Sequence, residues 1–515
     1  MLTSPVAAAE APGVQPYSEP FRPQFHFTPE RNWMNDPNGM VYHEGEYHLF
    51  YQYNPFGDKW GHMSWGHAVS SDLVHWEHLP LALPEEGEIM IYSGSAVVDF
   101  ANTSGFGREG LPPMVAIYTG HSEETKQTKR VEDQRLAYSN DRGRTWTQYS
   151  GNPVIDIGSP DFRDPKVFWH EATGRWIMVL VLAQEKKVRL YASPDLKNWT
   201  QLSEFGPAGA SRDPIIWECP DLFPLEVDGE TKWVLIVNIN PGGPAGGSGC
   251  QYFVGDFDGT RFALDPSYPA EGALWVDYGS DFYAAVTWSN VPKSDGRRIV
   301  LGWMSNWDYT QDVPTAPWRS AMTVPRSLTL ARTSEGLRLA QRPVDELTKL
   351  REAPPLAFPG GSFVEAAKWL SEQKNLPELL DVEMTFLGVS EETPFVINIR
   401  AGVGEVTAIA VVPASGKLIM DRTHSGLNGF HVAFAASARH EAPVEIANGK
   451  FTVRFLLDTS SLELFAQDGR AALTDLIFPA PGERSISLSS EGLKALSVPK
   501  VDRITIHKLK SAAPK

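Results

Sequence analysis

The feature that most constrains the fold of this chain is a β-hairpin pattern that recurs through its first two thirds. Runs of alternating apolar and polar residues, bounded by Gly, Pro, Asn and Asp, indicate strands, and amphipathic helices are scarce before residue 340. Long hairpins are predicted at residues 39–53, 94–119, 167–182, 221–239 and 284–304. The N-terminal region is therefore expected to be all-β.

A second signal alternates with the hairpins. Short polar turns that end in an aromatic residue follow the hairpins, namely "VSSDLVHW", "YSNDRGRTW", "YASPDLKNW" and, more faintly, "VGDFDGTRF". One hairpin with a second strand pair forms a sheet that cannot bury both faces alone, whereas a ring of such sheets buries them against one another. The repeat predicts a β-propeller, and five hairpins predict five blades.

The chain divides by its pattern into four parts. Residues 1–22 are expected to form an N-terminal tail, 23–340 the five-bladed propeller, 341–355 a linker with a Pro-rich exit, and 356–511 a separate domain. In the last part short strands with polar turns follow one another closely, which is typical of a β-sandwich. That domain contains no cluster of chemically reactive side chains, so the propeller is expected to carry the catalytic site.

The composition excludes several classes of partner. The 515 residues carry a formal net charge of -17, whereas nucleic acid or an anionic membrane as partner requires a basic surface. No apolar run approaches the roughly 20 residues of a membrane-spanning helix. Cys219 and Cys250 make neither a disulfide framework nor a zinc signature, and there is no Asp-x-Asp-x-Asp-Gly calcium loop. We therefore expect a neutral substrate, no metal and no cofactor.

The N-terminal segment gives the expected location of the protein. Its sequence, "MLTSPVAAAEAPG", has small residues like the end of a secretory signal but lacks the basic start and the apolar stretch. We interpret it as the remnant of a trimmed signal, and we expect a secreted or periplasmic protein. The sequence leaves the oligomeric state open.

Three acidic residues stand at equivalent points of three predicted hairpins. Asp36 precedes the first hairpin, Asp164 the third and Glu218 the fourth, and a proline follows each acid within two residues. The first strand of each propeller blade lines the central axis, so the three acids are expected to meet at one end of it. The prolines are expected to hold the residue before them in extended geometry as the chain enters the strand. One Asp beside a Pro is usually only a turn, but three gathered carboxylates destabilise a fold without compensation. They therefore indicate a site, a bound metal such as calcium, or both, and the missing calcium loop favours the site alone.

The residues around these acids favour a sugar substrate. Aromatic rings pack on the apolar faces of a sugar, and acids and amides accept its hydroxyl protons. Two of the three acids would then cleave a glycosidic bond, one by attacking or activating water and the other by protonating the leaving oxygen. Residues near the blade entrances and inner strands that would complete the site are Asn35, Gln52, Trp60, Ser93, Arg163 and Trp303.

A sialidase is the alternative class of propeller enzyme. The turn "SNDRGRTW" at residues 139–146 and the segment "FRDP" at residues 162–165 match patterns found in sialidases. The turn, however, is a structural corner of propeller blades wherever it occurs. A sialidase also needs an arginine cluster for the carboxylate of its substrate and a tyrosine nucleophile, and near the predicted site we place only Arg163.

Several ordered motifs add a family resemblance. They are "WMNDPNG" at 33–39, "FYQYNP" at 50–55, "WGHMSWGHAVSSDLVHW" at 60–76, "YSGSAV" at 92–97, "FRDPKVFW" at 162–169, "WECPDLFPL" at 217–225 and "GWMSNW" at 302–307. Together they resemble glycoside hydrolase family 32, and within it the exo-inulinase and levanase group of β-fructosidases. The segments "DRTHSG" and "LELFAQDGRAALTDLIFP" resemble the family's C-terminal sandwich. The resemblance implies a five-bladed propeller followed by a β-sandwich, and retaining, exo-acting release of terminal β-fructofuranosyl units from inulin, levan and sucrose.

The resemblance also implies roles for individual residues. It makes Asp36 the nucleophile, Glu218 the acid/base and Asp164 the stabiliser of the transition state. It further implies a substrate-binding set that consists of Asn35, Gln52, Trp60, Tyr92, Ser93, Arg163 and Trp303, with Tyr92 standing where the family commonly has Phe. A fructan-binding protein without activity is the alternative from another class, and the presence of all three acids argues against it.

Overall fold

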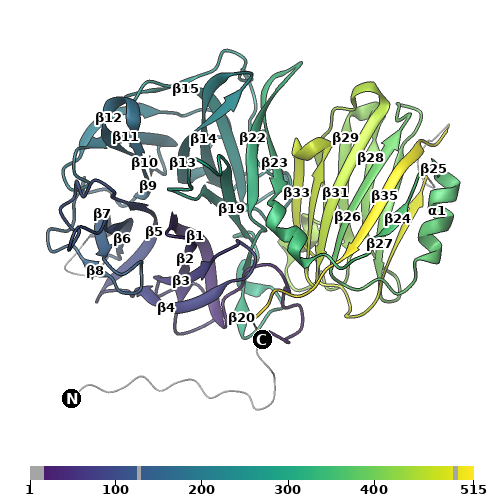
Figure 1. Ribbon diagram of the computed structural model, residues 1–515, viewed down its shortest axis with the longest axis horizontal. Coiled ribbons are helices and arrows are strands. Elements are labelled where there is room, and N and C mark those ends of the chain that lie inside the picture. The colour runs from purple at the N-terminus through teal and green to yellow at the C-terminus, as the bar shows by residue number, and fades with distance from the viewer. Residues whose placement is uncertain (1–16, 125–128, 491–496, 515) are drawn as a thin grey trace.

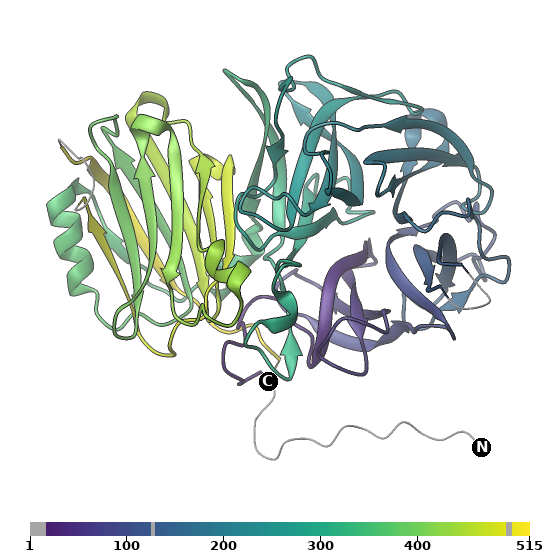
Figure 2. The same cartoon turned by 180° about the vertical axis from the view of Figure 1, so that it is seen from behind.

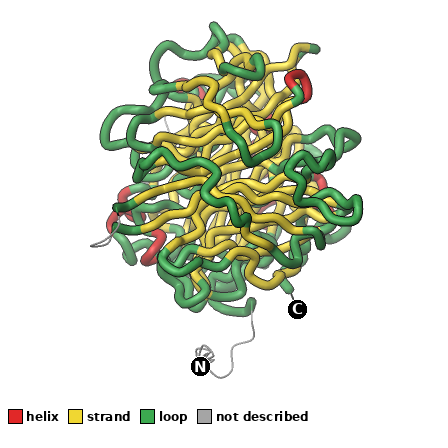
Figure 3. The backbone as a smooth tube through the Cα atoms, turned by 90° about the vertical axis from the view of Figure 1, so that its left-hand side faces the viewer, coloured by secondary structure: helices red, strands yellow, loops and turns green. Residues whose placement is uncertain are grey.

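Five antiparallel sheets surround one axis in the N-terminal part of the chain, and two stacked sheets form the C-terminal part (Figure 1; Figure 2). This arrangement comes from a computed structural model that describes residues 17–124, 129–490 and 497–514. Most of the expected N-terminal tail, residues 1–16, lies outside the described residues. Strands dominate the molecule in every view, including the view onto the propeller side (Figure 3). The prediction of an all-β protein with a five-bladed propeller and a sandwich is confirmed.

Each blade is built on an antiparallel sheet of four strands whose first two strands form one of the predicted hairpins. Blade 1 contains β1 (Asn32–His43), β2 (Glu46–Asn54), β3 (Ser64–Ser70) and β4 (Glu77–Leu83). Blade 2 contains β5 (Ile89–Val98), β6 (Met114–Ser122), β7 (Val131–Ser139) and β8 (Thr147–Gln148). Blade 3 contains β9 (Phe162–His170), β10 (Arg175–Leu182), β11 (Lys187–Ser193) and β12 (Thr200–Phe205). Blade 4 contains β13 (Ile216–Val227), β14 (Glu230–Asn240), β15 (Gly249–Phe257) and β16 (Phe262–Leu264), and blade 5 contains β18 (Tyr283–Thr287), β19 (Arg298–Met304), β22 (Arg326–Thr333) and β23 (Gly336–Pro343).

Short additional strands complete three of these sheets. They are β17 (Leu274–Trp275) in blade 4, β21 (Ala321–Met322) in blade 5 and β20 (Trp318–Arg319) in blade 1. Strand β20 follows β19 of the last blade in sequence but pairs in parallel with β1 of the first blade. The end of the propeller sequence is thereby attached to its beginning, which closes the ring.

One kind of turn joins the third and fourth strands of four blades. In each case an aspartate carboxylate accepts a hydrogen bond from a backbone N–H three or four residues further on, as the turn requires. The backbone N–H donates to the carboxylate in four pairs: His75 to Asp72 (2.9 Å), Thr145 to Asp141 (2.9 Å), Asn198 to Asp195 (2.8 Å) and Arg261 to Asp258 (2.7 Å). The segment that matched sialidases is therefore one copy of a repeated structural corner.

The C-terminal part consists of two antiparallel sheets. One contains β24 (Leu356–Phe358), β25 (Gly361–Ser362), β26 (Leu380–Leu387), β31 (Lys450–Asp458), β32 (Ser461–Ala466), β33 (Ala471–Leu476) and β35 (Lys500–Lys508). The other contains β27 (Phe395–Ala401), β28 (Glu405–Val412), β29 (Lys417–His424), β30 (Arg439–Pro443) and β34 (Arg484–Ser489). Buried Leu, Ile, Val and Phe side chains from both sheets form one core between them.

Helices are few in the described part of the chain. The α-helices are α1 (Phe363–Glu372) and α2 (Val432–Ala436), and the 3₁₀ helices are η1 (Glu171–Thr173), η2 (Thr310–Asp312), η3 (Asp345–Leu350), η4 (Pro413–Ser415), η5 (Ala447–Gly449) and η6 (Gln467–Gly469). Within the segment predicted as a linker, β23 extends to Pro343 and η3 follows. Helix α1, at the outer edge of the sandwich in Figure 1, was not predicted. Its signal is a capping box formed by Ser362 and Glu365.

Two buried ionic clusters join the sandwich to the propeller. In the first, Arg326 of β22 binds Asp277 (2.9 Å) and Glu463 of β32. His26 lies between the carboxylates of Asp458 (2.7 Å) and Glu463 (2.7 Å). All five side chains are fully buried, so each charge depends on its ionic partners, and the pairs with Asp458 and Glu463 join the propeller to the sandwich.

The second cluster lies beside η2 and centres on Arg422 of β29. Its guanidinium binds Asp281 of the propeller (2.7 Å), which also accepts a hydrogen bond from the hydroxyl of Tyr309 (2.6 Å). Asp475 of β33 binds His440 (3.1 Å) in the same cluster. Removing one member of a buried ionic group is strongly destabilising, and the two clusters therefore fix how the domains sit together.

The cluster around His26 predicts that the protein loses stability at alkaline pH. Burial opposes the charge of His26, but hydrogen bonds to Asp458 and Glu463 outweigh burial and raise its pKa from 6.5 to about 9. Because the pKa is raised in the folded state, the stabilisation is fully present below the unfolded value and is lost as the pH rises through about 9. As the pH rises through this range, the difference in the free energy of unfolding between the wild type and His26→Gln should fall by up to about 3 kcal/mol. Thermal unfolding of both proteins from neutral to alkaline pH measures this, and parallel curves would contradict it.

Candidate active site

The innermost strand of each blade contains a β-bulge close to its start. The register shifts lie between Met34 and Pro37 in β1, between Ile91 and Gly94 in β5, opposite Val179–Val181 in β9, between Glu218 and Asp221 in β13, and between Tyr283 and Val286 in β18. A bulge inserts an unpaired residue and redirects its side chain. The same irregularity in five strands therefore brings side chains from all blades to one place.

The three predicted acids lie at these bulges. Asp36 is in β1, Asp164 in β9 and Glu218 in β13. Each acid therefore lies inside its strand, whereas the sequence predicts a position just before the strand. The error has a physical reason: the bulge interrupts the regular alternation of the strand, and in the sequence that interruption looks like a strand entrance. The structure nevertheless brings all three acids together, as the sequence predicted.

The expected extended geometry before the prolines is wrong at two of the three, Pro165 and Pro220. Asp164 precedes Pro165 with a φ of 64°, and the residue before Pro220 is Cys219, with a φ of 43°. Left-handed backbone of this kind costs about 1–3 kcal/mol and persists only where other contacts hold it. Here the N–H of Asp164 donates to Thr119 Oγ1 (3.0 Å), and the N–H of Cys219 donates to Asp164 Oδ2 (2.9 Å).

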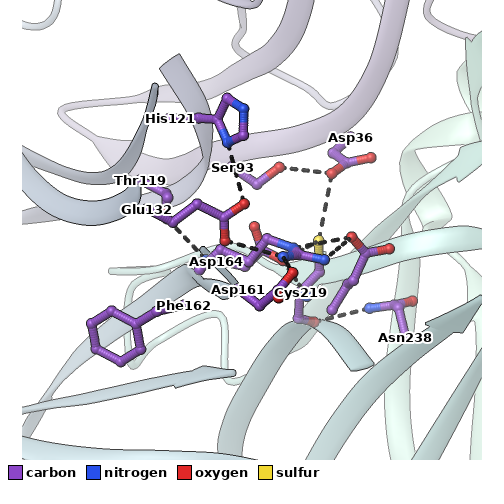
Figure 4. A network of polar contacts seen from close by, with 12 residues as sticks. Asp36, Ser93, Thr119, His121, Glu132, Asp161, Phe162, Asp164, Cys219 and Asn238 are labelled. Atoms are coloured by element: carbon purple, nitrogen blue, oxygen red, sulfur yellow. Dashed lines mark hydrogen bonds and ion pairs between the residues drawn. The ribbon is translucent and has the colours of Figure 1, made fainter. Parts of the chain in front are cut away.

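Asp36 is held by neutral hydrogen-bond donors. Its Oδ2 accepts a hydrogen bond from the hydroxyl of Ser93 on β5 (2.7 Å), and its Oδ1 accepts one from Asn35 Nδ2 (3.0 Å), as Figure 4 shows for Ser93. The thiol of Cys219 lies 3.5 Å from Oδ2. Burial raises the pKa of Asp36, the hydrogen bond from Ser93 lowers it, and the charge of Glu218 raises it further, so the net shift is upward.

Asp164 lies on the other side of the same sulfur atom. Cys219 Sγ is 3.6 Å from Asp164 Oδ2, and both residues are labelled in Figure 4. Arg163 Nε is 4.0 Å from the same oxygen. Burial raises the pKa of Asp164 to about 8, because the opposing effect of Arg163 is smaller and the charge of Glu218 adds to the rise. The two buried carboxylates therefore approach each other across one thiol.

Glu218 has charged and hydroxyl partners. Its Oε1 accepts hydrogen bonds from Arg163 (3.2 Å), and its Oε2 accepts one from the hydroxyl of Tyr283 on β18. Its side chain is 20 % exposed, against 6 % for Asp164. Glu218 is thus the acid nearer to solvent.

The predicted binding residues are placed in different ways around the acids. Asn35, Ser93 and Arg163 bind an acid directly. Tyr92, in the bulge of β5, lies edge-on to Trp60, with 6.3 Å between the ring centroids, and Trp60 is 38 % exposed. These aromatic rings form the more open part of the site.

Gln52 and Trp303 do not bind an acid directly. Gln52 lies on β2 between the two residues that pair on either side of the β1 bulge, and Trp303 of β19 pairs with Tyr283 next to the β18 bulge. Both side chains are buried, and the Gln52 Nε2 and Trp303 Nε1 donors have no hydrogen-bond partner among the described residues. Buried donors are usually paired, so these two groups are available to a bound molecule.

Sequence reasoning missed several residues that hold the acids. Thr119 and Tyr283 bind an acid directly, and so does Cys219. Asn238 acts through Cys219, and His121 and Glu132 act through Arg163 (Figure 4 shows Thr119, His121, Glu132, Cys219 and Asn238). Tyr283 had a usable signal, because it stands at the start of the fifth hairpin, and at this point three of the other blades carry an acid and the fourth carries a serine. The others lie on second or third strands or bond through the backbone, and no motif marks them.

A second layer of buried polar groups fills the axis next to the acids. Lys166, two residues after Asp164, binds Asp221 (3.2 Å) and the carbonyl oxygen of Thr287. Asp221 in turn accepts a hydrogen bond from the N–H of Thr287 (2.7 Å). These residues come from β9, β13 and β18, so the innermost strands are tied together on this side of the acids.

Within the described residues, no group of three or more His, Cys, Asp or Glu side chains is arranged to hold a metal ion. None of the helices described is long and apolar enough to cross a membrane. Cys219 and Cys250 are both free and buried.

Comparison with known families accounts for both domains. The model of the glycosyl hydrolases family 32 N-terminal domain matches residues 26–343, and the model of the family 32 C-terminal domain matches residues 363–508. The chain belongs to glycosyl hydrolase family 32. The resemblance identified from the motifs is confirmed, and so is the prediction that this family 32 chain is an enzyme.

Relatives of this family 32 enzyme match nearly its whole length. A levanase of Bacillus subtilis is 46% identical over 514 residues, covering 99% of this chain and 73% of the levanase. An extracellular exo-inulinase of Aspergillus awamori is 41% identical, covering 92% of this chain and 93% of the exo-inulinase. The crystal structure of an exo-inulinase from that organism superimposes with a TM-score of 0.87 at 38% identity over 96% of this chain and 100% of the other. A Schwanniomyces occidentalis fructofuranosidase complexed with fructosylnystose superimposes with a TM-score of 0.84 at 33% identity over 98% of this chain and 100% of the other.

The contact between Ser93 and Asp36 predicts a shift in the pH profile of hydrolysis. The Ser93 hydroxyl favours the ionised form of Asp36, so Ser93→Ala should raise the pKa of Asp36. A hydrogen bond to a charged group is worth about 1.5–3 kcal/mol, so the acidic limb of kcat/KM should move to higher pH by about one unit. The matched control is Ser95→Ala, because Ser95 lies on the same strand but binds the N–H of Val167. An unchanged acidic limb in Ser93→Ala, or an equal shift in the control, would contradict the prediction that Ser93 lowers the pKa of Asp36 during hydrolysis.

Proposed function

We propose that this enzyme is a retaining, exo-acting β-fructofuranosidase that releases terminal non-reducing fructose from fructans such as inulin and levan, and from sucrose. The names of its relatives, levanase, exo-inulinase and fructofuranosidase, support this substrate class. The observation that carries the proposal is the meeting of Asp36, Asp164 and Glu218 at three bulges, each with a different set of partners.

In the proposed reaction Asp36 is the nucleophile and Glu218 the acid/base. Asp36 attacks the anomeric carbon while Glu218 gives its proton to the leaving oxygen, which produces a covalent fructosyl intermediate on Asp36. Glu218, now ionised, takes a proton from water, and the resulting attack releases fructose with retained configuration. The Glu218 side chain is more exposed than that of Asp164. This supports Glu218 as the acid/base, because the leaving group departs toward solvent and the incoming water arrives from it.

Asp164 is proposed to stabilise the transition state without forming a covalent bond. Its carboxylate would accept hydrogen bonds from fructose hydroxyls, while the unpaired donors of Gln52 and Trp303 would serve hydroxyl oxygens. Trp60 and Tyr92 would pack against the apolar face of the sugar. Asn35, Ser93 and Arg163 complete the proposed set by orienting the acids.

The exo mode is supported by the closed side of the site. Lys166, Asp221 and Thr287 form a buried, mutually bonded layer on three innermost strands beside the acids, which supports a site that is closed on that side. A site with one entrance accepts a chain end rather than an internal unit. We also infer that the protein acts outside the cell, since several relatives are named extracellular.

Early digestion products of inulin test the exo mode. Free fructose should be the main product from the first time point, because each binding event removes one terminal unit. Chromatography of the products from inulin, levan, sucrose and raffinose, side by side, measures this. Oligosaccharides of mixed length with little fructose would refute the exo mode, and intact polymer would instead support a binding protein without activity.

The three acids should respond differently to substitution. Asp36→Ala should be inactive on every substrate, because no fructosyl intermediate forms. Glu218→Ala should lose about 10²–10⁴-fold on sucrose, yet form the intermediate from a donor with an acidic leaving group, which needs no proton. Azide should then rescue the second step and give β-fructosyl azide, the retained product. Asp164→Asn should lower kcat without any response to azide.

The same experiment detects an exchange of roles. Azide rescue of the Asp36 variant with the inverted product, and no rescue of the Glu218 variant, would show that the nucleophile and the acid had been interchanged. The stereochemistry of the azide is read by nuclear magnetic resonance.

A further inference from the structure

A fully buried carboxylate, Glu132 of β7, lies behind the site without contacting any of the three acids. Its Oε2 accepts a hydrogen bond from Arg163 Nη1 (3.0 Å). Its Oε1 lies 3.3 Å from His121 Nδ1 and 3.4 Å from Arg130 Nη2 (Figure 4 shows the contact with His121). The Glu132 side chain is 0% exposed, so a costly buried charge has been placed here.

Arg163 connects this carboxylate to the proposed acid/base. One edge of its guanidinium, Nε and Nη2, faces Glu218 Oε1 at 3.2 Å, and Nη1 faces Glu132. The planar guanidinium fixes its donors in one geometry, so an anchor at Nη1 also determines where the other two nitrogens point. Asp161 adds a weaker contact with Nη1 at 3.4 Å.

We propose that Glu132 is a positioning residue for the hydrolytic reaction: it holds Arg163 against Glu218 and offsets the positive charge of Arg163, so that Glu218 keeps the proton it must donate. The proposal rests on the function proposed above for Glu218. Glu132 contacts none of the three acids, and its proposed effect on Glu218 passes through Arg163.

The electrostatic argument follows from the charges around each carboxyl. The groups facing Glu218 are Arg163 from β9, Tyr283 from β18, Asp36 from β1, and Asp164 and Cys219. The groups facing Glu132 are Arg163, Arg130 and His121, and Glu123 lies beyond His121. A cation beside a carboxyl favours its ionised form, which would remove the proton from a general acid. A second carboxylate on the far side of that cation opposes this effect.

Glu132 is suited to this role because it stays ionised. Burial raises its pKa, but the hydrogen bond from His121 and the charge of Arg163 outweigh burial, and the net shift is downward. The ring of His121 also stacks on Tyr92, with 4.3 Å between centroids and 7° between planes. The anchor is therefore packed rigidly behind the aromatic side of the site.

The test compares two substitutions at Glu132 with one elsewhere. Glu132→Gln keeps the shape and an acceptor oxygen but removes the charge, whereas Glu132→Asp keeps the charge and withdraws it by one methylene from Arg163. The matched control is Asp381→Asn in the sandwich, since Asp381 is a buried carboxylate that binds Arg351 (2.8 Å) and Arg454 (2.9 Å) far from the acids in sequence. Glu132→Gln and Asp381→Asn each remove one buried carboxylate charge that is paired with arginine, so they share the general cost of losing such a pair.

We expect Glu132→Gln to move the alkaline limb of kcat/KM for sucrose to lower pH by about one unit. Its rate on sucrose at neutral pH should fall about 10–100-fold, and its rate on an aryl β-fructofuranoside with an acidic leaving group should fall less than about 3-fold, because that substrate needs little protonation. Glu132→Asp should show the same selective loss to a smaller extent. The control should lose thermal stability and keep the wild-type pH profile.

A purely structural role for Glu132 gives a different result. A folded Glu132→Gln with an unmoved alkaline limb, or with equal losses on both substrates, overturns the proposal. If the Gln variant does not fold, the ratio of the two rates in Glu132→Asp decides in the same way. Failure of the wild type to release fructose from sucrose or from the aryl fructoside overturns the proposed function itself, and the two failures are thus distinguishable.

Discussion

The β-bulge at the start of each innermost strand is the constraint on which the centre of this molecule depends. Successive side chains of a regular strand point to the two faces of its sheet, and in a propeller those faces pack against neighbouring blades. The bulge breaks that alternation and turns side chains toward the other blades. Hydrogen bonds then cross from blade to blade, as between Ser93 and Asp36 or between Tyr283 and Glu218. The contacts that orient the acids are also contacts that hold the ring together.

The repeat explains how much the sequence could predict. Hairpins and their turns are local patterns, so the five blades and the sandwich could be recognised, and the equivalent positions of Asp36, Asp164 and Glu218 showed that the acids would meet. The left-handed backbone at Asp164 could not be predicted, because a proline after it favours extended geometry. Hydrogen bonds with Thr119 and Cys219, which lie in other blades, hold the exception. Glu132 was missed for a similar reason, since its role depends on a partner in another blade.

The interface between the propeller and the sandwich is a second feature that the sequence did not predict. Sequence reasoning described the sandwich only as a separate domain without a cluster of reactive side chains, and it gave no contact between this domain and the propeller. The structure instead places fully buried charges across the boundary, with Arg326 of the propeller bound to Glu463 of the sandwich and Arg422 of the sandwich bound to Asp281 of the propeller. Separating the domains would leave these charges without partners, and an unpaired buried charge is far more costly than lost apolar contact. The sandwich is thus part of the propeller's stability although it adds no residue to the acids.

The division of partners among the acids gives each its chemical character. Asp36, the proposed nucleophile, is held by an amide and a hydroxyl, which stabilise its charge without a cation that would weaken the proposed attack on carbon. Glu218 faces the guanidinium of Arg163, which can compensate the charge that develops when the proton leaves. If Arg163 acted alone, however, its positive charge would also favour loss of the proton from Glu218 before the substrate binds. A buried carboxylate on the opposite edge of the guanidinium, at Glu132, resolves the conflict: the cation remains close to the acid while its net field there is reduced.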